Sequence, residues 1–191
     1  MKVSVQHKKK QDTTQLAAAE RSVQLQIGGA IAFTLLAFAL GFIVLPSVIA
    51  LPESLPDRLA FALHAAAAPF AVLLVAILMV STSRRKSLQD IHGSAYGPPS
   101  QQLAVKAAFL QNTLEQTVLL VGALLILATL LTDAYLVLLP VAAGLFVLGR
   151  IAFYLGYQKS SMYRAFGMGV SMLPAVFGYL WIAVLLLQKL F

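Results

Sequence analysis

The sequence predicts an all-α integral membrane protein, a bundle of five transmembrane helices. Of its 191 residues 60% are hydrophobic and only 11% are charged, a balance far too apolar for a surface that faces water. A helix needs about 20 apolar residues to cross a hydrocarbon core about 30 Å thick. Segments of that length run over residues 27–51, 59–82, 107–132, 135–157 and 165–187. Because each run is continuous rather than alternating, helices are expected.

The first 26 residues are polar and basic, so we expect a cytoplasmic tail there. Residues 27–57 are expected to form an additional N-terminal transmembrane helix and an exterior turn. The basic leader followed by Val48-Ile49-Ala50 is also compatible with a cleavable signal sequence. The apolar run is, however, longer than the roughly 7–15 residues of a signal sequence, which favours a retained helix.

Residues 58–191 hold the other four apolar segments, which are joined by one long loop and by short turns. Short turns favour antiparallel neighbours. If the five segments cross the membrane in alternating directions, nearly all Lys and Arg side chains outside the apolar segments lie on one side of it. Only Arg58 and Lys189 lie on the other side. Since cytoplasmic loops are rich in Lys and Arg, the N-terminus is expected to be cytoplasmic and the C-terminus exterior. We expect a multi-pass protein of a bacterial inner membrane.

Composition also limits the chemistry. The chain has no cysteine, which excludes disulfides, thiolate metal ligands and a protein thiol nucleophile. Any thiol chemistry must use a thiol that the substrate brings. No metal-binding motif is present, and no metal site is expected. The net charge of +7 is explained by the loops beside the helices, so we expect no nucleic-acid partner.

Two charged residues lie inside apolar segments, where each costs at least about 2.5 kcal/mol unless it has a partner or a wet cavity. Glu115 lies nine residues from Lys106, and Arg150 lies nine residues from Lys159. Both are therefore at a similar depth, roughly 13 Å from the cytoplasmic boundary at 1.5 Å per residue. We expect them to face each other or to share one ligand. The structural alternative is a buried ion pair between helices or subunits.

Other polar side chains share faces with these two. Asn112 lies one turn before Glu115, and Tyr154 and Tyr157 lie one and two turns after Arg150. Arg164 begins the last apolar segment and is placed to reach an anion at the mouth of the same cleft. The alternatives are interfacial aromatic residues for the two tyrosines and a helix anchor for Arg164.

These residues resemble a known family. The stretch Phe109-Leu-Gln-Asn112-Thr-Leu-Glu115-Gln resembles the N-x-x-E signature of the MAPEG proteins, the membrane-associated proteins in eicosanoid and glutathione metabolism. Gly149-Arg150-Ile-Ala-Phe-Tyr154-Leu-Gly156-Tyr157 resembles their third helix, and Arg164 falls where their fourth helix opens. The resemblance covers roughly residues 59–187.

The resemblance implies a four-helix subunit, a homotrimer, and glutathione as a co-substrate held between subunits. It implies that Arg164 is catalytic because it stabilises the glutathione thiolate. It further implies a set of glutathione contacts, namely Asn112, Glu115, Arg150, Tyr154, Tyr157 and one of the pair Arg84 and Arg85, with Arg85 the preferred candidate.

Two features depart from the family pattern. Family enzymes usually carry an arginine four residues before the asparagine, where this chain has Ala108. The additional N-terminal helix is also outside the four-helix pattern. The leading hypothesis is a membrane glutathione transferase or peroxidase whose hydrophobic small-molecule substrates are electrophiles or lipid hydroperoxides. The alternatives are a noncatalytic lipid-binding or scaffolding member, and a small transporter that uses Glu115 and Arg150.

Overall fold

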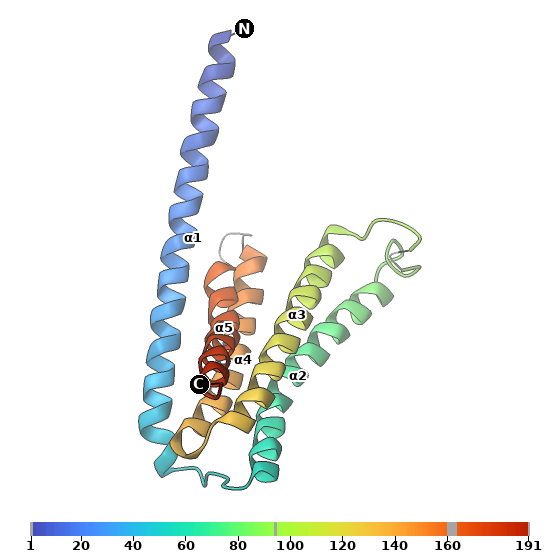
Figure 1. Cartoon of the computed structure of the whole chain (residues 1–191). Coiled ribbons are helices and arrows are strands. Elements are labelled where there is room, and N and C mark those ends of the chain that lie inside the picture. The colour runs from blue at the N-terminus through green and yellow to red at the C-terminus, as the bar shows by residue number, and fades with distance from the viewer. Residues whose placement is uncertain (1, 94, 160–163, 191) are drawn as a thin grey trace.

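A computed structural model describes residues 2–93, 95–159 and 164–190, with side chains from residue 16 to 158 within these ranges and from 164 to 190. All of the long elements in this part of the chain are α-helices, and each is long and apolar enough to cross a membrane, which confirms the five predicted spans. They are α1 (Lys2–Val44), α2 (Leu55–Arg85), α3 (Gln101–Leu130), α4 (Leu138–Lys159) and α5 (Ala165–Gln188) (Figure 1). Two 3-10 turns, η1 (Leu45–Ser47) and η2 (Asp133–Val137), follow α1 and α3.

Serine caps begin the second and third helices. The Ser54 hydroxyl accepts a hydrogen bond from the backbone N–H of Asp57, and Pro56 occupies the first turn of α2. The Ser100 hydroxyl accepts from the N–H of Leu103 in the same way. Such caps satisfy backbone donors that a helix leaves free at its start. The Ser100 cap marks where the long loop between α2 and α3 ends and α3 begins.

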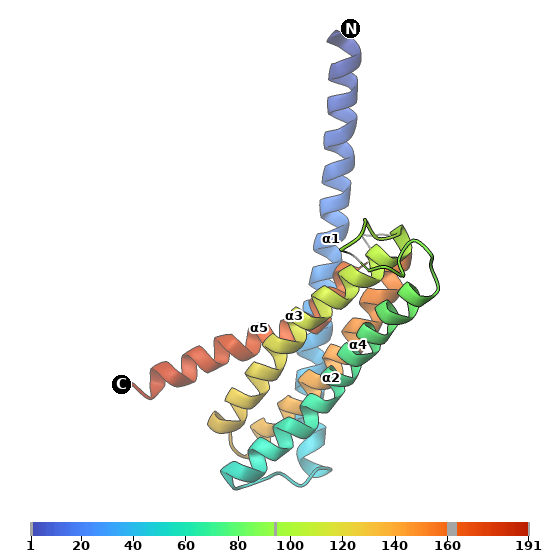
Figure 2. The same cartoon turned by 90° about the vertical axis from the view of Figure 1, so that its right-hand side faces the viewer.

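Helices α2 to α5 form a four-helix bundle. Helix α2 lies along α3, and α4 lies along α5, while α2 also contacts α4 and α3 also contacts α5. Leu120, Leu124, Leu139 and Phe146 lie in the shared core and are almost completely buried. In Figure 2 the C-terminal part of α5 leans away from the other three helices.

Helix α1 packs against α5 and α4 and extends far beyond the bundle at its N-terminal end (Figure 1). The expected tail over residues 1–26 is thus helical from Lys2 and continuous with the first span. The side chains of residues 1–15 lie outside the described part of the chain.

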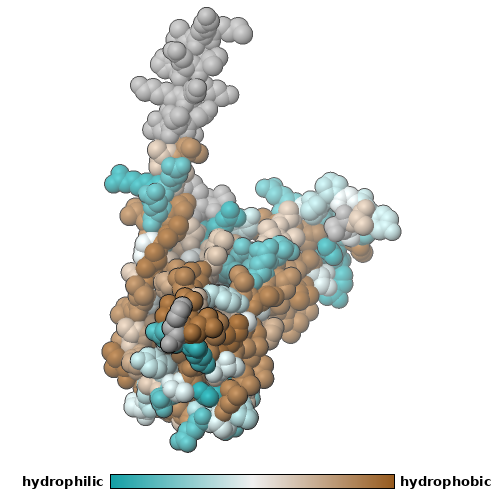
Figure 3. All heavy atoms as spheres, in the orientation of Figure 1, coloured by the Kyte–Doolittle hydropathy of each residue, from teal (hydrophilic) through white to brown (hydrophobic). Residues whose placement is uncertain are grey.

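The surface of the bundle is mostly apolar. Figure 3 shows hydrophobic residues over its flank, with hydrophilic residues gathered at the loop between α2 and α3 and at the opposite end. Large side chains such as Leu74, Leu148, Ile151 and Leu180 are more than half exposed. A surface of this kind is stable in lipid rather than in water, which agrees with a multi-pass integral membrane protein.

Candidate functional site

A buried arginine joins three helices. Arg150 on α4 is only 1% exposed. Its Nη1 donates to Oδ1 of Asn112 at 2.8 Å, and its Nη2 donates to Oε1 of Gln116 at 2.9 Å. The Ser171 hydroxyl on α5 accepts from Nη2 at 2.6 Å and from Nε at 3.1 Å. We call these four residues the Arg150 cluster.

Close helix packing brings the cluster together. A Cβ atom added to Gly149 would lie 2.5 Å from the backbone nitrogen of Ser171, and one added to Gly167 would overlap the backbone of Phe153. Glycines at both positions therefore let α4 and α5 touch through their backbones. This contact places the Ser171 hydroxyl within reach of Arg150.

The cluster contains a cation but no anion. Amide and hydroxyl oxygens are the hydrogen-bond acceptors that Arg150 has among the described residues. Its guanidinium also lies over the ring of Phe153, with 4.6 Å from Cζ to the ring centroid. Burying a charge is costly unless it is compensated, and neutral dipoles compensate it only in part. The arrangement favours an anion nearby.

The expected contact between Glu115 and Arg150 does not form in this structure. Glu115 is exposed, and its Oε1 accepts a hydrogen bond from Nε2 of Gln111 at 2.8 Å. Equal depth along two helices does not by itself bring two side chains together, because each side chain also has a direction around its helix axis. One residue corresponds to about 100° of rotation on a helix, so Gln116 faces Arg150 where Glu115 turns away.

The predicted tyrosines and Arg164 lie on a shared aromatic layer. Cζ of Arg164 lies 5.0 Å from the centroid of the Tyr157 ring. The ring of Tyr157 contacts that of Phe153 with centroids 5.7 Å apart, and the ring of Tyr154 contacts Phe109 at 5.1 Å. Since Phe153 also lies under Arg150, a row of aromatic rings connects the two guanidinium groups.

The basic pair at the end of α2 is separate from this arrangement. Arg84 is partly buried and Arg85 is exposed. Among the described residues, no hydrogen bond connects Arg85 with the Arg150 cluster. Arg85 is thus at the same end of the bundle as Arg164 but is not brought into the cluster.

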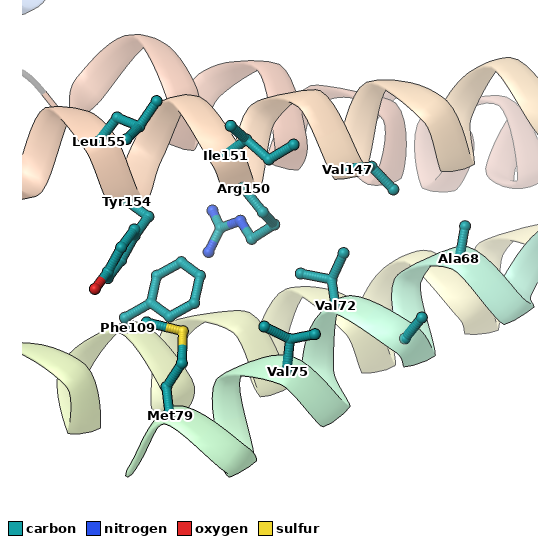
Figure 4. A pocket seen from close by; sticks show the side chains of 11 residues that line it. Ala68, Val72, Val75, Met79, Phe109, Val147, Arg150, Ile151, Tyr154 and Leu155 are labelled. Carbon is teal, nitrogen blue, oxygen red and sulfur yellow. The ribbon is translucent and has the colours of Figure 1, made fainter. Parts of the chain in front are cut away.

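A cavity of about 480 Å³ opens between α2 and α4, with Phe109 of α3 also in its wall. Figure 4 shows the Arg150 guanidinium between Tyr154 and the side chains of α2, close to the Phe109 ring. The remaining wall is aliphatic and includes Val72 and Met79. Glu115 does not line this cavity.

Sequence reasoning missed Gln116, Ser171, Phe109 and Phe153 as members of the arrangement. Gln116 follows Asn112 by one helical turn, a spacing that places both amides on one face. Ser171 is a hydroxyl in an otherwise apolar stretch one turn after Gly167. Both were detectable signals of a buried polar contact.

Comparisons with known proteins agree with the resemblance. A model of the MAPEG family matches residues 61–185, well over half of the chain. The chain is similar to transmembrane protein 79 of Bos taurus, with 28% identity over 86 residues, and to that of Mus musculus, with 27% identity over 86 residues. Each alignment covers 45% of this chain and 22% of the relative, so the chain matches only about a fifth of the length of these relatives. No solved structure matches this chain.

Proposed function

Because this chain belongs to the MAPEG family, we propose that it is a membrane-bound glutathione transferase or peroxidase that acts on hydrophobic electrophiles or lipid hydroperoxides. The observation that carries the proposal is the buried, anion-free Arg150 cluster beside the aromatic layer and Arg164. Glutathione is an anionic tripeptide with two carboxylates, one amine and a thiol. A fixed positive charge beside side-chain amides suits its carboxylates.

In this proposal Arg150 supplies the positive charge and orients the carboxamide of Asn112 toward the ligand. Glu115 is on the outer face of α3, where it binds the glutathione amine. A carboxylate on a lipid-facing surface costs about 2.5–3.5 kcal/mol, so this face of α3 needs a protein neighbour. A homotrimer provides one, because a second copy covers Glu115 and completes the binding site from the other side. We place this site on the cytoplasmic side of the membrane.

Arg164 has the catalytic role. A guanidinium keeps its charge in a poorly hydrated place and lowers the pKa of a thiol beside it, which raises the fraction of nucleophilic thiolate. With an aryl halide, the sulfur forms a bond to the ring carbon and the halide leaves. With a hydroperoxide, the sulfur takes the terminal oxygen, the alkoxide takes a proton, and a second glutathione thiol then releases water and forms glutathione disulfide. Tyr157 holds Arg164 in place through the contact between ring and guanidinium.

One observation favours a second candidate, a noncatalytic ligand-binding member. Ala108 lies one turn from Gln111 and two turns from Glu115 on the exposed face of α3. The cation that family enzymes carry at this position is missing. A protein with a weakened carboxylate contact would hold a lipid or glutathione without turning it over.

The test is glutathione-dependent turnover of an aryl halide and of cumene hydroperoxide by detergent-purified protein. We expect Arg164→Ala to lower both rates at least about tenfold, a barrier increase of about 1.4 kcal/mol. Arg21→Ala, an exposed arginine on α1 outside the family match, should leave both rates unchanged. Glutathione binding without turnover would favour the noncatalytic candidate. Absence of both binding and turnover would reject the glutathione assignment.

A further inference from the structure

A second cavity, of about 570 Å³, lies between α1 and α5. Val23 and Ile27 of α1 form one wall, and Met168, Met172 and Val176 of α5 lie along the other. The polar side chain in this cavity is that of Arg164, at one end. Helix α1 ends before residue 61, where the family match begins, so one wall belongs to the additional helix.

Specific contacts hold α1 against α5 beside Arg164. Oε1 of Gln26 accepts a hydrogen bond from the backbone N–H of Phe166 at 3.4 Å. The rings of Phe33 and Phe166 contact each other with centroids 6.1 Å apart. A Cβ added to Gly169 would lie 2.8 Å from that of Ala30, so the two helices approach closely at this point. One wall of this cavity, which we call the α1–α5 groove, is therefore a consequence of the docking of α1 against α5.

The shape and polarity of the groove define what it can hold. Between Arg164 and Val176 it follows α5 for about 18 Å, at 1.5 Å per residue. Its length suits an unbranched chain better than a compact ring system. Methionine side chains adapt to chains of different curvature. Arg164 offers a donor set that can hold a thiolate and a second acceptor at the same time, because a guanidinium has five N–H groups.

We propose that α1 and α5 together form the subsite for the second substrate, a long unbranched acyl or alkyl chain whose polar, reactive end lies at Arg164. The assignment rests on the proposed function, because Arg164 holds the thiolate there. Val23 and Ile27, from the helix that the family match does not include, select chain-bearing substrates over compact ones. The additional helix is thus a specificity element.

Binding is tested first, without glutathione. The probe is a long-chain fatty acid with a photoreactive diazirine in the middle of its chain. Its carboxylate takes the place of the polar, reactive end of the substrate at Arg164. Mass spectrometry of the labelled native protein should place the saturable label on groove residues of α1 and α5. We expect Arg164→Gln, or the methyl ester of the probe, to reduce groove labelling several-fold. Uniform labelling of all lipid-facing helices, or labelling mainly in the cavity between α2 and α4, overturns the proposal.

Selectivity is tested next, through two hydroperoxides. Ile27→Trp, which fills the groove, should lower kcat/KM for dodecyl hydroperoxide at least about fivefold relative to tert-butyl hydroperoxide. Leu25→Trp, an exposed position on the same helix, should leave this ratio unchanged. A ratio that is the same in wild type and Ile27→Trp overturns the selectivity assignment. Groove labelling without any glutathione turnover rejects the proposed function but still identifies a lipid site, so the two failures are distinguishable.

Discussion

The guanidinium of Arg150 and the side-chain carbonyl of Asn112 are joined by a hydrogen bond of 2.8 Å that ties α4 to α3 inside the apolar bundle. Hydrogen bonds to charged groups contribute about 1.5–3 kcal/mol each, which is more than neutral ones do. The same guanidinium also binds Gln116 and Ser171, so three helices share one cation. This relationship determines which polar atoms are available for a ligand.

The glycine contact between α4 and α5 should tolerate no side chain. Gly167→Ala places a methyl group against the backbone of Phe153, and overpacking of this kind costs about 1–3 kcal/mol. We expect a clear fall in the thermal unfolding midpoint of the purified protein. Gly144→Ala is the matched control, since its Cβ would meet nothing within 4 Å and Ala is favoured over Gly in a helix. Equal midpoints for the two variants would show that the close contact is absent.

Double-mutant cycles should distinguish the partner of Arg150. Arg150→Met combined with Gln116→Leu should show a coupling of about 0.5–3 kcal/mol in unfolding free energy, because the two side chains share a hydrogen bond. The same cycle with Glu115→Gln should be additive within about 0.5 kcal/mol. Strong coupling between Glu115 and Arg150 would mean that the two meet across subunits.

The loop between α2 and α3 should depend on the ionised form of Asp90. The backbone N–H of Ser100 donates to this carboxylate at 2.8 Å and the Ser100 hydroxyl at 2.7 Å, and both bonds lower the pKa of Asp90 below its ordinary value of 3.8. Since the folded pKa is the lower one, the stabilisation is present above pH 3.8 and is lost as the pH falls through the folded pKa. We expect Asp90→Asn to speed hydrogen exchange at the Ser100 amide at neutral pH.

Asp57→Asn is the control for this loop, because Asp57 lies at the other end of α2 and should not alter exchange at Ser100. In the wild-type protein, the ratio of the hydrogen-exchange rate of the Ser100 amide to its intrinsic rate should rise only below about pH 4. A rise that begins near neutral pH would assign the effect to another group.

Restoring the family arginine should strengthen glutathione binding. Ala108→Arg places a cation on the exposed face of α3 that carries Gln111 and Glu115. One new charged hydrogen bond of about 1.5 kcal/mol corresponds to a Kd roughly tenfold lower. Ala104→Arg, also exposed and one turn earlier, is the control and should change Kd little. A weaker affinity in Ala108→Arg would place the ligand elsewhere.

Much of the fold could be predicted from the sequence, because lipid imposes a length on apolar segments. The five spans follow from this constraint. The start of α1 could not be predicted in this way, because residues 2–26 are polar and apolar length gives no information about helices beyond the bilayer. Helix continuity there depends on local backbone preferences alone.

The candidate site was predictable only in part. Depth along a helix comes from counting residues, and it predicted Arg150 to be level with Glu115; the partners of Arg150 on α3, Asn112 and Gln116, lie on either side of Glu115 in the sequence. Direction around the helix depends on which faces pack, and this packing is set by Gly149 and Gly167. The contact between α4 and α5 brings Ser171 to Arg150, while on α3 it is Gln116 that faces Arg150 and Glu115 that faces outward.

Calorimetric titration of glutathione into the purified protein tests the central claim most directly. The account predicts saturable binding to the wild-type protein and a Kd at least about tenfold higher for Arg150→Lys, since one ammonium cannot donate to Asn112, Gln116 and Ser171 in the geometry of a guanidinium. The thermal midpoint of the variant, measured on the same sample, reports whether it is folded. Absence of glutathione binding in the wild type, or an unchanged Kd in a folded Arg150→Lys protein, would contradict the account.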